Sequence, residues 1–178
     1  MKTSSRMLIA IVFAALLTCI VSPCDAATKS IDKRTYSDRT GNRYFVVFVA
    51  RGGTPTGHAY VAWGTQTATS CSQVGYGFYP VSTVKAIAFQ NVPGTLVNEA
   101  FNTNSTLITD RLIVEVNKEA FFDSQKACVT WATTDYNKFS SNCINFAMDC
   151  AKRTGLRVPS KDSIQTPSSY MQRLINSN

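Results

Sequence analysis

The spacing of the apolar residues changes near residue 117, and this change constrains the fold more than any other feature. Before it, apolar and β-branched residues form short runs or alternate with a period of two, which is typical of strands. After it, apolar residues recur with the spacing of an amphipathic helix. Strands followed by helices predict an α+β domain in which an antiparallel sheet packs against a C-terminal helical pair.

Two runs in the first half predict an antiparallel hairpin. Residues 43–50, RYFVVFVA, form a continuous apolar run, and HAYVAWG, which begins at His58, alternates with a period of two. The segment RGGTPTG between them supplies glycine and proline for a turn. A further strand is expected in LITDRLIVEVN, whereas VSTVKAIAFQ predicts either a strand or a short helix.

Two helices are expected in the second half. The first runs from about Lys118 to about Tyr136. The second follows residues 140–142, whose side chains are all of N-cap type, and it ends at Gly155 with two basic residues in its last turn. The C-terminal stretch PSSYMQRLINS is expected to add one or two more helical turns.

The N-terminal segment has the layout of a secretory signal peptide. Basic residues precede an unbroken apolar run over residues 7–21, and small residues follow, with cleavage expected after Ala26. The run is shorter than the roughly 20 residues that span a bilayer, so no integral membrane segment is expected in the mature chain. The expected organisation is a signal peptide over 1–26, a polar lead-in over 27–42 and a single domain over 43–178. The expected location is secreted or periplasmic.

The charge of the chain is positive, with a formal net charge of +7. The basic residues are scattered without interleaved aromatics, so nucleic acid is not an expected partner. A cationic surface suits attraction to anionic envelope polymers or membranes, and equally serves solubility alone. One histidine and no C-x-x-C pair leave no set of metal ligands, so no metal or other cofactor is expected.

Four cysteines follow the apolar N-terminal segment: Cys71, Cys128, Cys143 and Cys150. In an exported protein four cysteines usually form two disulfides. Cys143 and Cys150 are seven residues apart on one predicted helix, about 10 Å along its axis, which is too far for a bridge. If the two helices pack as an antiparallel hairpin, Cys128 and Cys150 come close enough to pair. A bridge from Cys71 to either of these two is the alternative.

Cys143 occupies a different position from the other cysteines. It follows Asn142 in the first turn of a predicted helix, where free main-chain N–H groups and the helix dipole favour a thiolate. A nucleophilic cysteine needs a base, and His58 is the only histidine in the chain. A helix start packed across the face of the sheet that carries His58 would bring the two side chains together.

Four motifs carry a resemblance to a known superfamily: GHAYVAWG, GYGFYP, VPGTL and NCINFAMDCAKRTGLRVP. Together they resemble the circularly permuted papain-fold proteins, relatives of the NlpC-type cell-wall peptidases and of the lecithin retinol acyltransferase-like enzymes. The resemblance spans about Arg43 to Pro159 and implies His58 as base and Cys143 as nucleophile. It also implies a third polar residue on a neighbouring strand, which the sequence does not identify. A second histidine, used by some acyltransferase-like members, is absent from the sequence.

The predicted function is that of an exported cysteine peptidase or amidase. It would act by acyl transfer through Cys143 and His58, with the main-chain N–H groups of the helix start capped by Asn142 stabilising the oxyanion. The expected substrate is a peptide or amide, with cell-wall peptides the first choice. Two alternatives stay open: a non-catalytic binding or inhibitor module on the same fold, and a structural domain clamped by disulfides.

Overall fold

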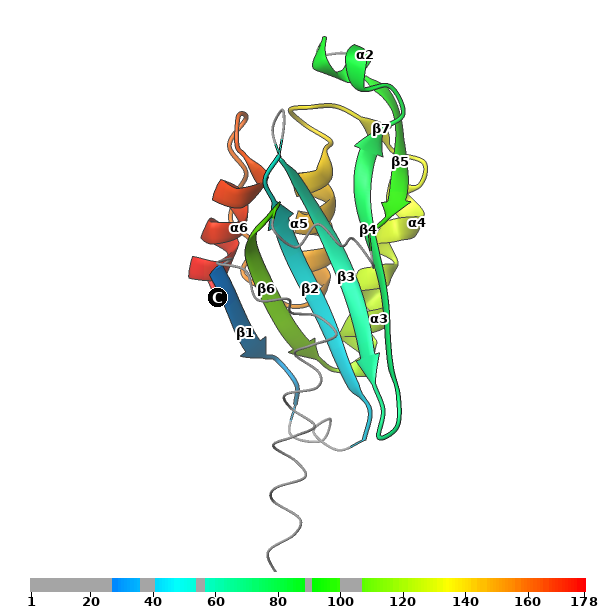
Figure 1. The fold of residues 1–178 in the computed structure, drawn as a ribbon, viewed down its shortest axis with the longest axis vertical. Coiled ribbons are helices and arrows are strands. Elements are labelled where there is room, and N and C mark those ends of the chain that lie inside the picture. The colour runs from blue at the N-terminus through cyan, green and yellow to red at the C-terminus, as the bar shows by residue number, and fades with distance from the viewer. Residues whose placement is uncertain (1–26, 36–40, 54–56, 89–90, 100–106) are drawn as a thin grey trace, which may run out of the picture.

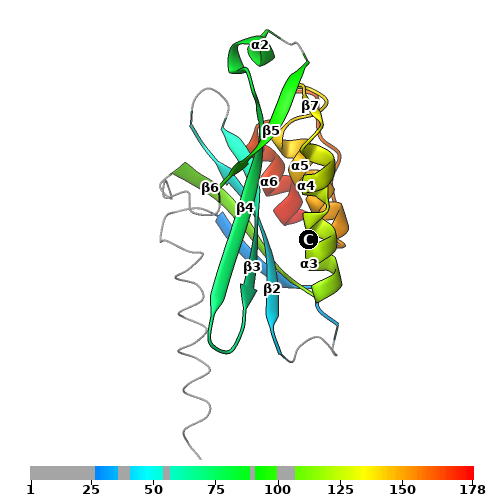
Figure 2. The same ribbon diagram turned by 90° about the vertical axis from the view of Figure 1, so that its right-hand side faces the viewer.

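The protein has an α+β fold, as the sequence predicts. A computed structural model describes residues 27–35, 41–53, 57–88, 91–99 and 107–178, and these residues form one curved sheet with helices on one of its faces (Figures 1 and 2). The predicted signal peptide over 1–26 lies outside the described residues. Within the described ranges, no helix is long and apolar enough to cross a membrane.

The described residues form a sheet of seven strands. In chain order the strands are β1 (Ala27–Asp32), β2 (Arg43–Arg51), β3 (His58–Gln66), β4 (Cys71–Pro80), β5 (Val92–Asn98), β6 (Ile108–Val116) and β7 (Asp135–Tyr136). Across the sheet the order is β1-β6-β2-β3-β4-β5-β7. β1 runs parallel to β6, and the other neighbouring pairs are antiparallel.

The hairpin predicted from residues 43–50 and the run that begins at His58 is confirmed. β2 and β3 pair along their whole length, and the register places Arg51 opposite His58 and Ala50 opposite Ala59. Gly57, directly before β3, has a φ of 74°, a left-handed conformation that glycine adopts without strain. The turn between the strands therefore fixes where β3 starts, and with it the position of His58.

The two faces of the sheet bury two separate sets of side chains. On β3, Val61 and Trp63 pack in the main core with the helices, whereas Tyr60 and Ala62 pack with residues of β2 and β6 on the opposite face. Trp63 also donates a hydrogen bond of 2.7 Å from Nε1 to Oγ of Ser124 on a helix. Each fully buried large apolar side chain contributes roughly 1.5–3 kcal/mol of stability. The largest in the main core include Trp63, Tyr170, Phe48, Phe78, Phe146 and Leu112.

The helices differ in one respect from the prediction. They are α2 (Thr83–Ile87), α3 (Lys118–Gln125), α4 (Ala127–Trp131), α5 (Cys143–Arg153) and α6 (Pro167–Asn176). The prediction of a single helix from Lys118 to Tyr136 is wrong, because this segment contains two helices, α3 and α4, and then β7. The hydroxyl of Thr134 donates to the carbonyl of Thr130 at 2.8 Å, a local bond that competes with further helix. Asp135 and Tyr136 then pair with β5.

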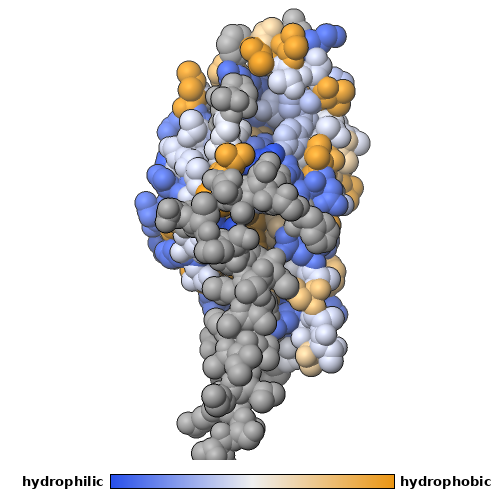
Figure 3. Space-filling view, in the orientation of Figure 1, coloured by the Kyte–Doolittle hydropathy of each residue, from blue (hydrophilic) through white to orange (hydrophobic). Residues whose placement is uncertain are grey.

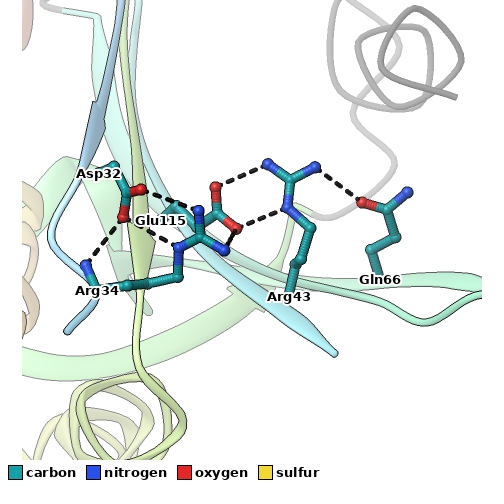
Figure 4. Close-up of polar contacts among 5 residues, drawn as sticks. All are labelled: Asp32, Arg34, Arg43, Gln66 and Glu115. Carbon is teal, nitrogen blue, oxygen red and sulfur yellow. Dashed lines mark hydrogen bonds and ion pairs between the residues drawn. The ribbon is translucent and has the colours of Figure 1, made fainter. Parts of the chain in front are cut away.

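The polar segment after residue 26 contains an edge strand, a feature that the expected lead-in over 27–42 did not include. β1 pairs with β6 over its six residues. An ion-pair network anchors the segment (Figure 4). Glu115 on β6 binds the guanidinium groups of Arg34 and Arg43, at 2.8 and 2.6 Å, and Arg34 also binds Asp32 at 2.9 Å. The strand is held by its main-chain pairing with β6, and only Ile31 packs against the main core, so its largely polar sequence did not indicate a strand.

Candidate active site

The start of α5 is a capped helix N-terminus, as the sequence predicts. The Oδ1 atom of Asn142 accepts hydrogen bonds from the main-chain N–H groups of Ile144, at 3.0 Å, and Asn145, at 3.4 Å. The Oδ1 atom of Asn145 accepts in return from the N–H of Asn142 at 3.2 Å, which completes a capping box. The Nδ2 atom of Asn142 donates to the carbonyl of Lys138. The side chain of Asn142 is therefore committed to the cap, and it holds the next residue, Cys143, in a fixed place.

The thiol of Cys143 lies against the start of β3. The main-chain N–H groups of Ala59, Ile144 and Cys143 itself point at the sulfur. The pairing of β3 with β4 begins at Tyr60, the residue after Ala59. The N–H of Ala59 is therefore not used by β4 and can donate to the thiol. Cys143 is buried, and burial raises the pKa of its thiol despite these donors and the nearby charge of Lys161. The helix start alone predicted a lowered pKa, so desolvation outweighs the dipole here.

The imidazole of His58 lies on the other face of the sheet. It stacks on the ring of Tyr79, with centroids 3.9 Å apart, and its Nε2 occupies the space that a side chain at position 77 would fill. Gly77 and Tyr79 alternate along β4 with Phe78, which belongs to the helix-covered core. His58 therefore faces away from the helices, whereas Cys143 comes from a helix.

Burial sets the protonation state of His58. It lowers the pKa of the imidazole from 6.5 to about 3, and the positive charge of Arg51 acts in the same direction. Nε2 has no hydrogen-bond partner among the described residues. The side chain is thus a neutral, buried imidazole with one unused nitrogen.

Three polar residues beside His58 were not identified as site residues from the sequence. Arg51 donates from Nη2 to the hydroxyl of Tyr79 at 2.7 Å and to Oε1 of Glu99 at 3.2 Å, and the Tyr79 hydroxyl donates to the same Glu99 oxygen. Burial, followed by the bond to Glu99, raises the pKa of Tyr79. The hairpin register could have identified Arg51, because it lies opposite His58. Glu99 reaches the cluster only through the pairing of β4 with β5, which the sequence does not reveal.

The structure brings Cys143 and His58 to the same end of β3 but does not join their side chains. The thiol contacts the N–H of the residue that follows His58, yet no hydrogen bond links these two described side chains. The third polar residue implied by the resemblance is not identified among the described residues either.

The predicted disulfide is absent from the structure. None of the four described cysteines, Cys71, Cys128, Cys143 and Cys150, forms a disulfide. Cys128 does lie near Cys150. Cys150 belongs to the main core, and Cys128 packs against it. Burial is the main reason that the pKa of the Cys150 thiol is raised, and a charge on Cys128 raises it further. The predicted proximity of Cys128 and Cys150 is therefore confirmed, but no disulfide joins them. Cys150 is fully buried in the main core without a cross-link.

Comparison with known proteins gives a likeness in fold. No family of known proteins and no curated protein matches the sequence. Among solved structures, the fold is similar to that of the type VI secretion system effector TseH, with a TM-score of 0.55 and 14% sequence identity. The similarity covers 77% of this chain and 90% of that chain. At this identity, the likeness establishes a shared fold and nothing finer.

Proposed function

We propose that the protein is an exported cysteine hydrolase that cleaves an amide bond, with Cys143 as nucleophile and His58 as base. The observation that carries the proposal is the position of the thiol. It is held at a capped helix start, among main-chain N–H donors, beside the residue that follows the only histidine of the chain. The fold that it shares with a secretion-system effector supports a role outside the producing cell.

The proposed reaction is acyl transfer. Nε2 of His58 accepts the proton of the thiol, and the sulfur attacks the carbonyl carbon of the substrate. The N–H groups that point at the sulfur, those of Ala59 and Cys143, stabilise the negative oxygen of the tetrahedral intermediate. The C–N bond breaks, the amine leaves with the proton from the imidazole, and water hydrolyses the thioester. This reaction requires the start of β3, next to Gly57, to rearrange when substrate binds, so that the imidazole leaves Tyr79 and moves from the opposite face of the sheet to the thiol.

Cell-wall peptides are the proposed substrates, and they provide the test. Purified peptidoglycan and its isolated stem peptides are incubated with the protein, and the products are identified by mass spectrometry. Cys143→Ala and His58→Ala are each expected to reduce turnover by about a thousandfold or more, and the double variant by no more than either one. Cys71→Ala is the matched control, because Cys71 is an exposed cysteine at the start of β4.

A covalent intermediate gives the second readout. Acid quenching during turnover traps the thioester, and peptide mapping is expected to place the acyl group on Cys143. Full turnover by folded Cys143→Ala protein, or an acyl group on another residue, would exclude the proposed nucleophile.

A second candidate function has its own supporting observation. The thiol and the imidazole approach from opposite faces of the sheet, and burial raises the pKa of one and lowers that of the other. These features fit a non-catalytic binding module on the same fold. That function predicts that wild-type protein and Cys143→Ala bind cell-wall peptides with equal affinity in calorimetry, with no product formed by either.

A further inference from the structure

One end of the molecule carries exposed apolar side chains on a projecting element. α2 lies in the connection between β4 and β5, beyond the end of the other strands (Figures 1 and 2). Val81, Val84 and Ile87 recur at every third residue of this segment, and they are 65%, 80% and 52% exposed. Apolar side chains gather at the same end in the space-filling view (Figure 3). Single exposed apolar residues are ordinary, whereas a contiguous exposed apolar patch is typical of an interaction site.

Two loops extend this surface, and hydrogen bonds hold them in place. Asn137 donates from Nδ2 to Oδ1 of Asn91, at 2.6 Å, which ties the loop before α5 to the base of the α2 segment. Phe139 in that loop is 37% exposed, and its carbonyl accepts a 2.6 Å bond from Nζ of Lys161. Lys161 lies three residues before Ile164, which is 86% exposed. Three segments distant in sequence thus meet at one end.

Positive charge accompanies these side chains. The apolar end comprises Val81, Val84, Ile87, Phe139 and Ile164. Lys85, Lys138 and Lys161 lie among them, the first two exposed and the third half-buried. The acidic groups nearby are Asp135, which is exposed, and Asp162, which is paired with Arg173 at 2.8 Å. Counted together, the three lysines and Arg173 outnumber these two carboxylates, in keeping with the positive net charge of the chain.

We propose that the apolar end binds the surface of an anionic lipid bilayer. Aliphatic tips on a projecting element can enter the boundary between headgroups and acyl chains without a shaped partner pocket. The neighbouring lysines would then be attracted to the anionic headgroups, and salt weakens this attraction. A protein partner is the less suitable occupant, because a stable protein interface uses about 20–30 residues on each side.

A fluorophore at the tip tests the proposal directly. Val84→Cys is labelled with an environment-sensitive dye in a Cys71→Ser background, which removes the exposed native thiol. Vesicles of phosphatidylglycerol and phosphatidylcholine are expected to shift its emission to the blue, and vesicles of phosphatidylcholine alone to leave it unchanged. Val129→Cys is the matched control, because Val129 is 76% exposed on α4, outside the apolar end, and its label should not respond. The chain from Ala27 onward is used, because the apolar run over residues 7–21 would itself bind vesicles and Cys19 and Cys24 would also take the dye. The readout is local to the labelled residue.

Partitioning measurements separate the two contributions. In vesicle flotation, Val84→Asp is expected to weaken binding at least tenfold, and Val129→Asp to leave it unchanged. Lys85→Glu is expected to weaken binding to vesicles that contain phosphatidylglycerol by several-fold and to make that binding less sensitive to salt. An emission shift at residue 84 that grows with protein concentration without vesicles would show that a second copy covers the tip. That result, or equal shifts at residues 84 and 129, overturns the proposal.

Discussion

The buried imidazole of His58 predicts that the protein loses stability in mild acid. Its pKa is about 3 in the folded protein, through burial first and the charge of Arg51 second, against 6.5 when unperturbed. Between these values the unfolded chain binds a proton that the folded chain rejects. The stability provided by the neutral imidazole is therefore complete above pH 6.5 and declines as the pH falls toward 3.

The magnitude follows from the size of the shift. Each pH unit in this window costs about 1.4 kcal/mol, so at pH 4.5, two units below 6.5, the loss is about 2.7 kcal/mol. His58 is only 8% exposed, so solvent screening reduces this value little. It is also the only histidine, so no other side chain has an ordinary pKa near 6.5.

Urea unfolding followed by tryptophan fluorescence, at pH 7.5, 6.5, 5.5 and 4.5, measures the effect. His58→Gln is the comparison, because glutamine keeps polar atoms at the site but does not titrate. Carboxylates titrate in both proteins, so the difference between their stability curves isolates the histidine. The wild type is expected to lose about 2.7 kcal/mol more than the variant between pH 7.5 and 4.5. Parallel curves would refute the reasoning and show that the imidazole is solvated or paired in solution.

Three further predictions concern packing and charge. Ser124→Ala leaves the buried N–H of Trp63 without its acceptor and is expected to cost about 1–3 kcal/mol in urea unfolding; an unchanged midpoint would mean that the hydrogen bond contributes nothing. Arg43→Met removes one of two guanidinium groups from Glu115 and is expected to cost about 1–3 kcal/mol; an unchanged free energy of unfolding would mean that Arg34 alone satisfies the carboxylate. Cys150→Ala removes a fully buried free thiol and is expected to cost about 1–2 kcal/mol, equally with and without reductant; a larger cost without reductant would reveal a disulfide.

Local patterns in the sequence determined the class of fold and most of its elements. The continuous run of β2 and the alternation of β3 identify the hairpin, because side chains on a strand alternate between faces. The cap of Asn142 and the closing Gly155, with a φ of 72°, fix both ends of α5, since helix ends need these residue types to satisfy their main-chain groups. These features depend on neighbours a few residues apart, which a sequence displays directly.

Tertiary structure alone decided how the candidate site is arranged. β1 and β7 exist because distant strands pair with them, and their short polar sequences give no sign of it. The face on which His58 lies follows from the register set by the turn before β3, and a shift of one residue would reverse it. The pKa values of Cys143 and His58 depend on burial by residues remote in sequence, and desolvation of a charge outweighs the local donors that the sequence reveals.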